Sequence, residues 1–264
     1  MGSGVGPGRV LGLLVAKIDR PMQEKYISSV IAMHSPTVDV VVPVLPGEVL
    51  APTLLEALPR PLVRNVFVGK VGNAEVPATS LGTGVEVMDV EPGGFGAAVI
   101  AGLQRLESLA ERPAIVVVLP GNGSYDPSEM TALLRPIVKS RYDLVIGAHA
   151  LGPGHGASLP VIDRLGSRVA VTLIRVIYGS WYSDLSPYFA VRFPALVALG
   201  VTDRKAGFGA ELRVKAVKIG LRVAEVPVTL RQPQQPAGGG GTLKDRLEAG
   251  SRTFFQIVRN ATLR

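Results

Sequence analysis

The chain has 264 residues, of which 47% are hydrophobic and only 5% aromatic, and its formal net charge is +7 at pH 7. This size and composition suit one large α/β domain, or one domain with appendages, around an aliphatic core. The absence of cysteine excludes disulfides, thiolate metal sites and cysteine nucleophiles. The positive charge suits nucleotides, phospholipid headgroups or nucleic acid as partners, although many soluble proteins are simply basic.

Three regions are predicted along the chain. Residues 1–36 form an N-terminal extension that we expect to be partly disordered, with a short helix over 22–33. Residues 37–232 form the α/β domain. Residues 233–264 contain a Gly-rich loop and then a basic amphipathic helix, because the run Pro-Gln-Gln-Pro-Ala-Gly-Gly-Gly-Gly interrupts regular structure. The apolar stretch near the start, 10–16, is far shorter than the ~18 residues of a membrane-spanning helix.

The α/β domain alternates valine-rich runs with helical patterns. This order predicts a mostly parallel sheet with right-handed crossovers and helices on both faces. Strands are expected over 38–43, 64–70, 85–90, 114–119, 143–148, 188–192 and 222–230. Helices are expected over 51–58, 97–111, 128–140, 163–178 and 210–219. Open α/β sheets bind ligands in the loops that follow the carboxyl ends of their strands, so functional residues are sought there.

Several blocks in the second half of the chain carry a family resemblance. They occur in order at 142–147, 164–168, 177–179, 183–188, 207–211 and 220–228. With the strand and Gly-rich turn at 116–127, they resemble family 2 glycosyltransferases of the polyprenyl-phosphate sugar synthase type, over roughly residues 38–264. The resemblance implies the GT-A fold, which is a Rossmann-like nucleotide-diphosphosugar transferase domain.

The resemblance also implies a set of site residues. Asp184 is in the place of an acceptor-side carboxylate and is the candidate general base. The candidate nucleotide-sugar-binding residues are Pro43, Glu48, Asn73, Gly94, Gly96, Asn122, Asp126 and Glu211.

Each of these residues also has a purely structural interpretation. Asp126 precedes a proline and suits a helix N-cap, and Asp184 could be a loop carboxylate bound by backbone amides. Glu211 could be the exposed or capping start of a helix. The turn Gly93-Gly94-Phe95-Gly96 could do no more than open a helix, since a glycine turn is a weak signal by itself.

Other positions depart from the family pattern. Pro120 and Asn122 replace the two aspartates of the Asp-x-Asp metal site, Lys70 replaces an acidic residue, and His149 and Phe189 replace arginines. Proline offers no ligand atom and asparagine offers one neutral oxygen, whereas Mg²⁺ and Mn²⁺ prefer carboxylates. We therefore expect no metal site and no cofactor; Mg²⁺ or Mn²⁺ is expected only if the protein is an active enzyme.

The terminal helix is both basic and apolar. Its apolar positions Leu243, Leu247, Phe254, Ile257, Val258 and Ala261 fall near one face, and Lys and Arg outnumber Asp and Glu. Such a helix can bind an anionic membrane, or it can pack on the core with its basic face in water.

Two functional classes follow. The departures favour a pseudoenzyme, a glycosyltransferase-like scaffold that binds a partner protein, an anionic membrane surface or a nucleotide without turnover. The alternative is an active inverting transferase that moves a sugar from a nucleotide sugar to a polyprenyl-phosphate-type acceptor. A nucleic-acid partner is disfavoured, because no platform of aromatic and basic residues is present. The expected location is the cytoplasm, with peripheral binding at the inner membrane surface as a further option.

Overall fold

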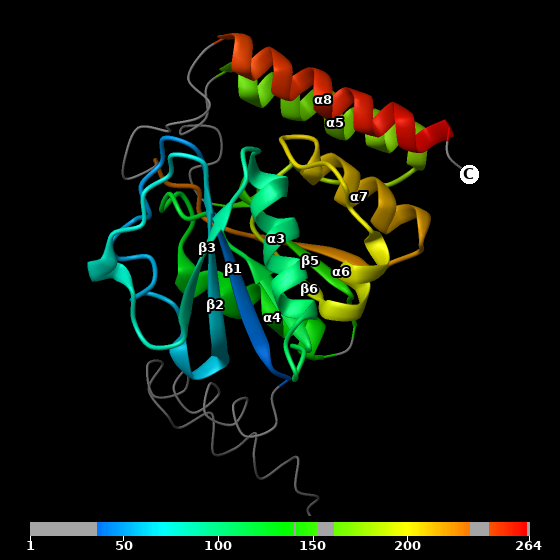
Figure 1. The fold of residues 1–264 in the computed structure, drawn as a ribbon. Helices are drawn as coiled ribbons and strands as arrows, with labels where there is room; N and C mark the ends of the chain where they lie inside the picture. The colour runs from blue at the N-terminus through cyan, green and yellow to red at the C-terminus, as the bar shows by residue number, and fades with distance from the viewer. Residues whose placement is uncertain (1–35, 140, 153–160, 233–242, 263–264) are drawn as a thin grey trace, which may run out of the picture. The chain divides into compact units, whose positions relative to one another are not determined.

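The structure of the protein is a computed structural model that describes residues 36–139, 141–152, 161–232 and 243–262 (Figure 1). All of these residues belong to one unit of the chain, Pro36–Arg264. The helix predicted over 22–33 and the Gly-rich run 233–241 lie outside the described residues.

The described residues form a seven-stranded, mostly parallel sheet in the order β3-β2-β1-β4-β6-β5-β7. Its strands are β1 (Val38–Val44), β2 (Val63–Val71), β3 (Val85–Val90), β4 (Ile115–Val118), β5 (Leu144–Ala148), β6 (Phe189–Arg192) and β7 (Val223–Pro227). The predicted α/β class is confirmed. Only β6 runs antiparallel to its neighbours β4 and β5.

The direction of β6 follows from the helix before it. Helix α5 (Val161–Tyr178) packs mainly on α7 (Phe208–Lys218) and α8 (Leu243–Thr262) rather than on the strands. It is therefore not a crossover that carries the chain back to the end of the sheet where β5 began. The chain re-enters the sheet at the end where β5 finished, so β6 runs antiparallel between β4 and β5.

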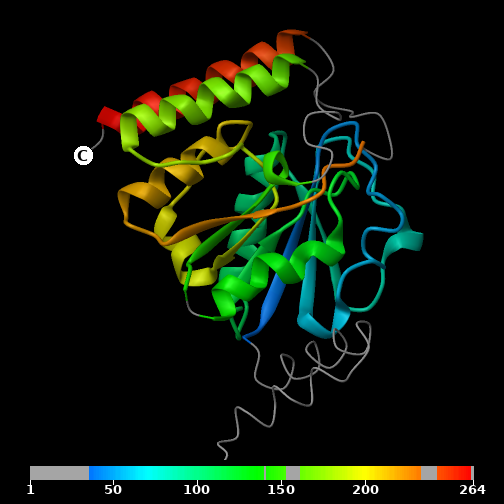
Figure 2. The ribbon, with the colours of Figure 1, turned by 180° about the vertical axis from the view of Figure 1, so that it is seen from behind.

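The remaining helices cover both faces of the sheet. Helix α4 (Met130–Val138) covers one face, while α3 (Phe95–Glu107), α6 (Phe193–Leu199) and α7 lie on the other (Figures 1 and 2). Helices α5 and α8 lie side by side as an outer layer over α7.

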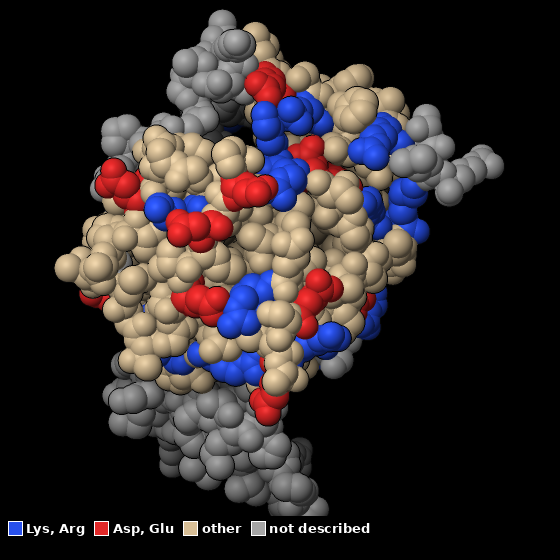
Figure 3. All heavy atoms as spheres, viewed as in Figure 1, with Lys and Arg blue, Asp and Glu red and all other residues tan. Residues whose placement is uncertain are grey.

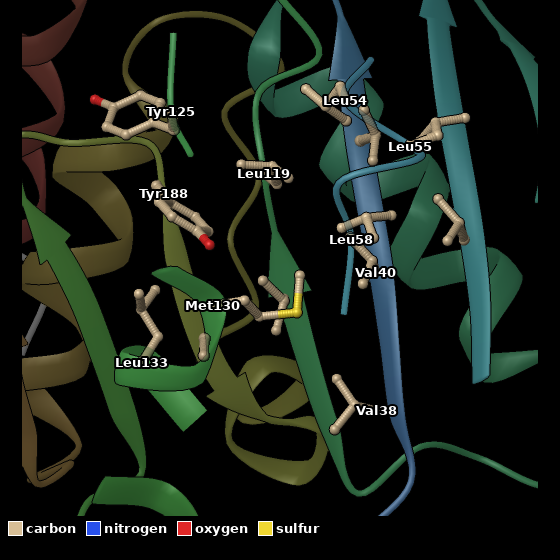
Figure 4. Close-up of a cluster of buried hydrophobic side chains, with 14 of the residues drawn as sticks. Val38, Val40, Leu54, Leu55, Leu58, Leu119, Tyr125, Met130, Leu133 and Tyr188 are labelled. Atoms are coloured by element: carbon tan, nitrogen blue, oxygen red, sulfur yellow. The ribbon is translucent and has the colours of Figure 1, made fainter. Parts of the chain in front are cut away.

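Two apolar cores result, because successive side chains of a strand point to opposite faces. In β1, Val40 and Val42 contact the core beneath α4, whereas Val41 contacts the core beneath α3 and α7. Figure 4 shows the first core, where Met130 and Leu133 of α4 lie near Tyr188 and the leucines of the loop after β1. Both faces of the central strands are buried, which explains their uninterrupted valine runs.

The helix predicted over 51–58 is wrong, because this segment forms turns. Its leucines Leu54, Leu55 and Leu58 are nevertheless buried. However, the amide of Ala51 donates to the carbonyl of Gly121, and the segment makes only isolated helical hydrogen bonds. The contact with the neighbouring loop takes precedence over a regular helix here.

Helix α6 was not predicted, although its boundary signals are present. Pro194 lies in its first turn, and Gly200 ends it with φ of 51°, which is the usual arrangement of proline and glycine at helix ends. At seven residues it is too short for a clear apolar period.

Candidate functional site

The loop that follows β4 is joined tightly to β1. The amide of Gly121 donates to the carbonyl of Pro43 at 2.8 Å. A Cβ atom at Gly121 would lie 2.8 Å from a side-chain carbon of Val44, so only glycine permits this approach. These contacts fix Pro120 and Asn122, the two positions of the metal motif, close to the end of β1.

The structure brings Asn122 and Glu48 together. The Nδ2 of Asn122 donates to Oε1 of Glu48 at 3.1 Å, and its Oδ1 accepts the amide hydrogen of Ser124 at 3.1 Å. Glu48 is buried, and its Oε2 accepts the amide hydrogen of Leu45 at 2.9 Å. Both atoms of the Asn122 amide group are therefore engaged within the chain.

Asp126 caps the 3-10 helix η3 (Pro127–Glu129), as one interpretation of the sequence predicted. Its Oδ1 accepts the amide hydrogen of Ser128 at 3.0 Å, and its Oδ2 pairs with Arg231 at 2.5 Å. Burial would raise the pKa of Asp126, but the bonds from Ser128 and the charge of Arg231 outweigh it, so the pKa is lowered. Its role in nucleotide-sugar binding stays a prediction.

A pocket of about 330 Å³ opens where the loop after β4 meets α5, the loop before β6 and the 3-10 helix η4 (His149–Leu151). It contains two of the predicted positions, Pro120 and Asn122. Its lining residues are Pro120, Asn122, Ser124, Tyr125, His149, Ser167, Leu185, Pro187 and Leu230.

One wall of this pocket is a histidine supported by a buried aspartate. Nδ1 of His149 lies 3.3 Å from Oδ2 of Asp184, whose side chain also accepts the amide hydrogens of Ala150 and Ser186, each at 2.8 Å. Asp184 is 3% exposed, so it is the imidazole rather than the carboxylate that lines the pocket. The role of Asp184 as a base stays a prediction, and the structure adds His149 in front of it.

A second layer lies behind this pair. The hydroxyl of Ser186 donates to that of Tyr125 at 3.2 Å, and Tyr125 lies 3.5 Å from Nδ1 of His149. Arg213 is 1% exposed and donates to the carbonyls of Ser186 and Gly209, each at 3.0 Å. Burial lowers the pKa of Arg213, and the charge of Asp184 opposes that shift. The buried Asp184 carboxylate and Arg213 guanidinium are thus held behind the imidazole of His149, which lines the pocket.

This arrangement defines what His149 can do chemically. Burial lowers the pKa of His149, more than the neighbouring charge of Asp184 raises it, and Arg213 lowers it further. The neutral ring, with its Nδ1 hydrogen toward Asp184, keeps a lone pair on Nε2 that can accept a proton. Sequence reasoning missed this pair because the two residues are far apart in the chain and no local motif connects them.

The lowered pKa of His149 predicts a pH effect on stability. An unfolded histidine, with a pKa near 6.5, binds a proton more readily than the folded one, so the stabilisation is complete above that pH and is lost as the pH falls. We expect the free energy of unfolding, measured in urea, to fall from about pH 7.5 to about pH 5.5, and to fall less in His149→Gln. Equal losses in both proteins would show that His149 does not cause the effect.

The remaining predicted residues do not line this pocket. The amide of Gly94, at the start of α3, donates to the carbonyl of Arg204 at 2.9 Å, and a Cβ at Gly96 would lie 1.9 Å from the carbonyl oxygen of Asp203. The open glycine turn thus accommodates the protein's own chain. Asn73 is exposed in the turn after β2.

Glu211 is buried in the first turn of α7 and holds the adjacent loop. Its carboxylate accepts the amide hydrogens of Thr202 at 3.1 Å and Asp203 at 2.8 Å and pairs with Lys215 at 2.8 Å. Burial would raise the pKa of Glu211, but Lys215 and these amides lower it overall. Glu211 is therefore buried rather than exposed, and its carboxylate holds the loop that precedes α7. Its role in nucleotide-sugar binding stays a prediction.

The donor groups in the loop after β4 do not fit a divalent metal. Pro120 has no ligand atom, the amide group of Asn122 is engaged by Glu48 and Ser124, and Asp126 is paired with Arg231. Across the described parts of the chain, no three His, Asp or Glu side chains gather in a group that could hold a metal ion. No helix in these parts is long and apolar enough to span a membrane.

Comparisons with known proteins show the family. No protein-family model matches the chain. An uncharacterized glycosyltransferase of Mycobacterium bovis is 33% identical over 198 residues, which covers 75% of this chain and 86% of the relative. The undecaprenyl-phosphate mannosyltransferase of Micrococcus luteus is 26% identical over 140 residues, covering 52% of this chain and 56% of that protein.

A solved structure shows the same fold. Glucosyl-3-phosphoglycerate synthase from Mycobacterium tuberculosis, in complex with phosphoglyceric acid, superposes with a TM-score of 0.66 at 20% identity and covers 87% of this chain and 81% of that one. The same synthase has been crystallised with Mn²⁺, UDP-glucose and phosphoglyceric acid. The chain belongs to the glycosyltransferases, as its resemblance to family 2 implied, and it has their GT-A fold.

Proposed function

We propose that this chain is a glycosyltransferase that has lost metal-dependent sugar transfer and serves as a binding scaffold. One observation carries the proposal: both polar atoms of the Asn122 amide group already have partners in Glu48 and Ser124. In the solved relative, Mn²⁺ and UDP-glucose are bound together. A metal in such a site neutralises the pyrophosphate charge that develops as the sugar leaves. Here the corresponding loop presents proline and an engaged amide instead of carboxylates.

Calorimetric titration tests this proposal. UDP, GDP and their sugars are titrated into the full chain with and without Mn²⁺, and sugar release and transfer are followed in parallel. We expect Mn²⁺ to leave any nucleotide affinity unchanged and to produce no turnover. Saturable transfer that requires Mn²⁺ would overturn the proposal.

A designed variant tests whether the loop after β4 is the cause. Pro120→Asp combined with Asn122→Asp restores two carboxylates, so we expect this variant to bind Mn²⁺ more tightly than the parent chain does. Asn73→Asp is the matched control, because it adds a carboxylate to an exposed turn after another strand. If the double variant gains no more Mn²⁺ affinity than the control, these two positions do not explain the loss.

The pair of His149 and Asp184 favours a second candidate, an active inverting transferase that needs no metal in this loop. His149 would accept a proton from the acceptor, and Asp184 would hold its ring, while a nucleotide sugar and a polyprenyl-phosphate-type acceptor are the substrates. Its test is transfer of labelled sugar in the presence of a chelator. If transfer occurs, Asp184→Asn is expected to lower turnover while leaving donor affinity nearly unchanged, because Asp184 would support the protonated ring of His149 mainly in the transition state.

A scaffold requires a partner. The two candidates are another protein and an anionic membrane surface, the latter reached by peripheral binding from the cytoplasm. The basic composition of the chain supports an acidic partner in either case.

A further inference from the structure

Helices α5 and α8 form an outer layer that is attached firmly to the rest of the molecule. They lie side by side above α7 in both views (Figures 1 and 2). The hydroxyl of Tyr178 in α5 donates to the carbonyl of Ile257 in α8 at 2.6 Å, and Ile257 is fully buried. The outward sides of both helices face away from the sheet. The residues on these sides therefore indicate whether water or another surface covers them.

Helix α5 carries an apolar stripe on its outward side. Leu165, Val169 and Val176 recur at helical spacing and form one line along the helix. They are 60%, 52% and 76% exposed, while Ala170 and Ile174 on the opposite side are buried. Scattered apolar residues are normal on a protein surface, but a continuous line of them calls for an explanation.

Helix α8 also exposes apolar side chains on its outward side, and these include two phenylalanines. Leu247, Phe254 and Val258 form a line on its outward side, and Phe255 lies beside them. Both phenylalanines are more than half exposed, whereas the polar Gln256 on the inward side is 4% exposed. This helix therefore buries an amide and exposes two aromatic rings, the reverse of what water as the only neighbour would favour.

Positive charge accompanies these two stripes. The two helices together contain seven lysines and arginines and three acidic residues, a formal net charge of +4. Figure 3 shows more basic than acidic side chains along the edge of the molecule over α8. Just beyond α5, the exposed Trp181 stacks under the guanidinium of Arg175 at 3.1 Å from its ring centroid.

We propose that α5, α8 and Trp181 form a face that docks on an anionic lipid bilayer. Apolar stripes with phenylalanine and leucine, flanked by arginine and an exposed tryptophan, match the interfacial zone of a membrane, where rings enter the headgroup layer and cations meet phosphates. A second copy of the chain fits poorly, because two such faces would bring like charges together. This inference is independent of whether the pocket transfers sugar.

The face and the pocket share an element. Ser167 of α5 lines the pocket, and Leu165 and Val169 on the same helix belong to the docking face. Ser167 follows Leu165 by two positions, about 200° around the helix, so the pocket is on the opposite side of α5 from the apolar stripe. The helix therefore separates the docking face from the pocket.

Vesicle binding of the full chain tests the inference. Trp181 is the only tryptophan, so its fluorescence reports contact with lipid directly. Vesicles of phosphatidylglycerol mixed with phosphatidylcholine are expected to shift its emission to the blue, and brominated lipids are expected to quench it. Vesicles of phosphatidylcholine alone, or raised salt, should weaken the binding, because exposed charges are screened.

The test variant combines Val176→Glu with Phe254→Glu, and the control variant is Val138→Glu. Val138 is an exposed valine at the end of α4, 39% exposed against 76% for Val176, and α4 lies far from α5 and α8 in both ribbon views. The double variant should lose vesicle affinity by at least about tenfold, from the lost apolar burial of two side chains, while Val138→Glu retains it. Circular dichroism checks that each variant is folded.

Three results would overturn the inference. The first is a parent chain that does not bind anionic vesicles, and the second is a folded double variant that binds them as well as the parent does. The third is a parent chain that dimerises through this face, becomes a monomer in the double variant, and ignores vesicles. None of these measurements involves a nucleotide or a sugar, so their failure would remove the membrane from the two candidate partners but leave the proposed loss of metal-dependent transfer untouched.

Discussion

Gly96→Ala is expected to lower the free energy of unfolding by about 3 kcal/mol, the upper end of what overpacking costs. A Cβ atom at Gly96 would lie 1.9 Å from the carbonyl oxygen of Asp203 and 2.9 Å from its carbonyl carbon. Both are backbone atoms, and the amides of Thr202 and Asp203 are held by the buried Glu211. The loop cannot retreat without losing these bonds. Urea denaturation measures the change through the midpoint at unchanged slope.

Gly250→Ala is the matched control and should change stability in the opposite direction. Gly250 also lies in a helix, α8, but nothing lies within 4 Å of the Cβ position. Alanine there is expected to stabilise by roughly 0.5–1 kcal/mol, because glycine loses more backbone entropy in a helix. Equal effects at both positions would contradict the close approach of α3 to Asp203. Gly96 would then remain available for a ligand, as the family resemblance implied.

Arg213→Met is expected to lower the free energy of unfolding by about 3–5 kcal/mol, as when one member of a buried charge pair is removed. The guanidinium is 1% exposed and donates to the carbonyls of Ser186 and Gly209, while its charge faces Asp184. Methionine has a similar length but removes the donors to the buried carbonyl of Ser186 and the partly buried carbonyl of Gly209. It also leaves the buried carboxylate of Asp184 without its nearby cation. Thermal unfolding should therefore begin roughly 6–20 °C lower.

Two comparisons separate charge from packing in that result. Lys70→Met removes one member of an exposed pair, Lys70 with Asp89 at 3.3 Å, and should cost no more than about 1 kcal/mol. Arg213→Met combined with Asp184→Asn removes both buried charges, so its cost should be smaller than the sum of the two single changes. Strict additivity would show that Arg213 acts through packing alone.

Both predictions concern buried contacts made by α7 with the loops around it. Gly96 and Glu211 hold the loop at 202–205, and Arg213 supports the Ser186 backbone in front of which Asp184 and His149 lie. The same α7 thus carries Glu211 on one side and Arg213 on another. Damage to the Arg213 contact is expected to reach the pocket through the backbone of Ser186, whose neighbours Leu185 and Pro187 line it.

The sequence was sufficient for the strands and for the class of fold. Valine runs that end in glycine or polar turns report strands buried on both faces, and this signal is local and strong. The N-cap role of Asp126 was also readable, because a cap depends on residues only two positions away. The segment 51–58 shows the limit of this signal. A helix was predicted there, but the segment forms turns and its Ala51 amide bonds to the carbonyl of Gly121, which is distant in sequence.

Only the tertiary structure decided the site and the docking face. The pairs of Asn122 with Glu48 and of His149 with Asp184 join residues 74 and 35 positions apart, and no periodicity connects such positions. Sequence periodicity placed Ile257 with Phe254 and Val258 on one apolar face of the last helix. In the structure, α8 packs on α5 and α7 so that Ile257 is fully buried, whereas Phe254 and Phe255 are more than half exposed. The apolar residues of this helix occupy more than one of its sides. Only the elements against which the helix packs determine which of these sides is buried in the core.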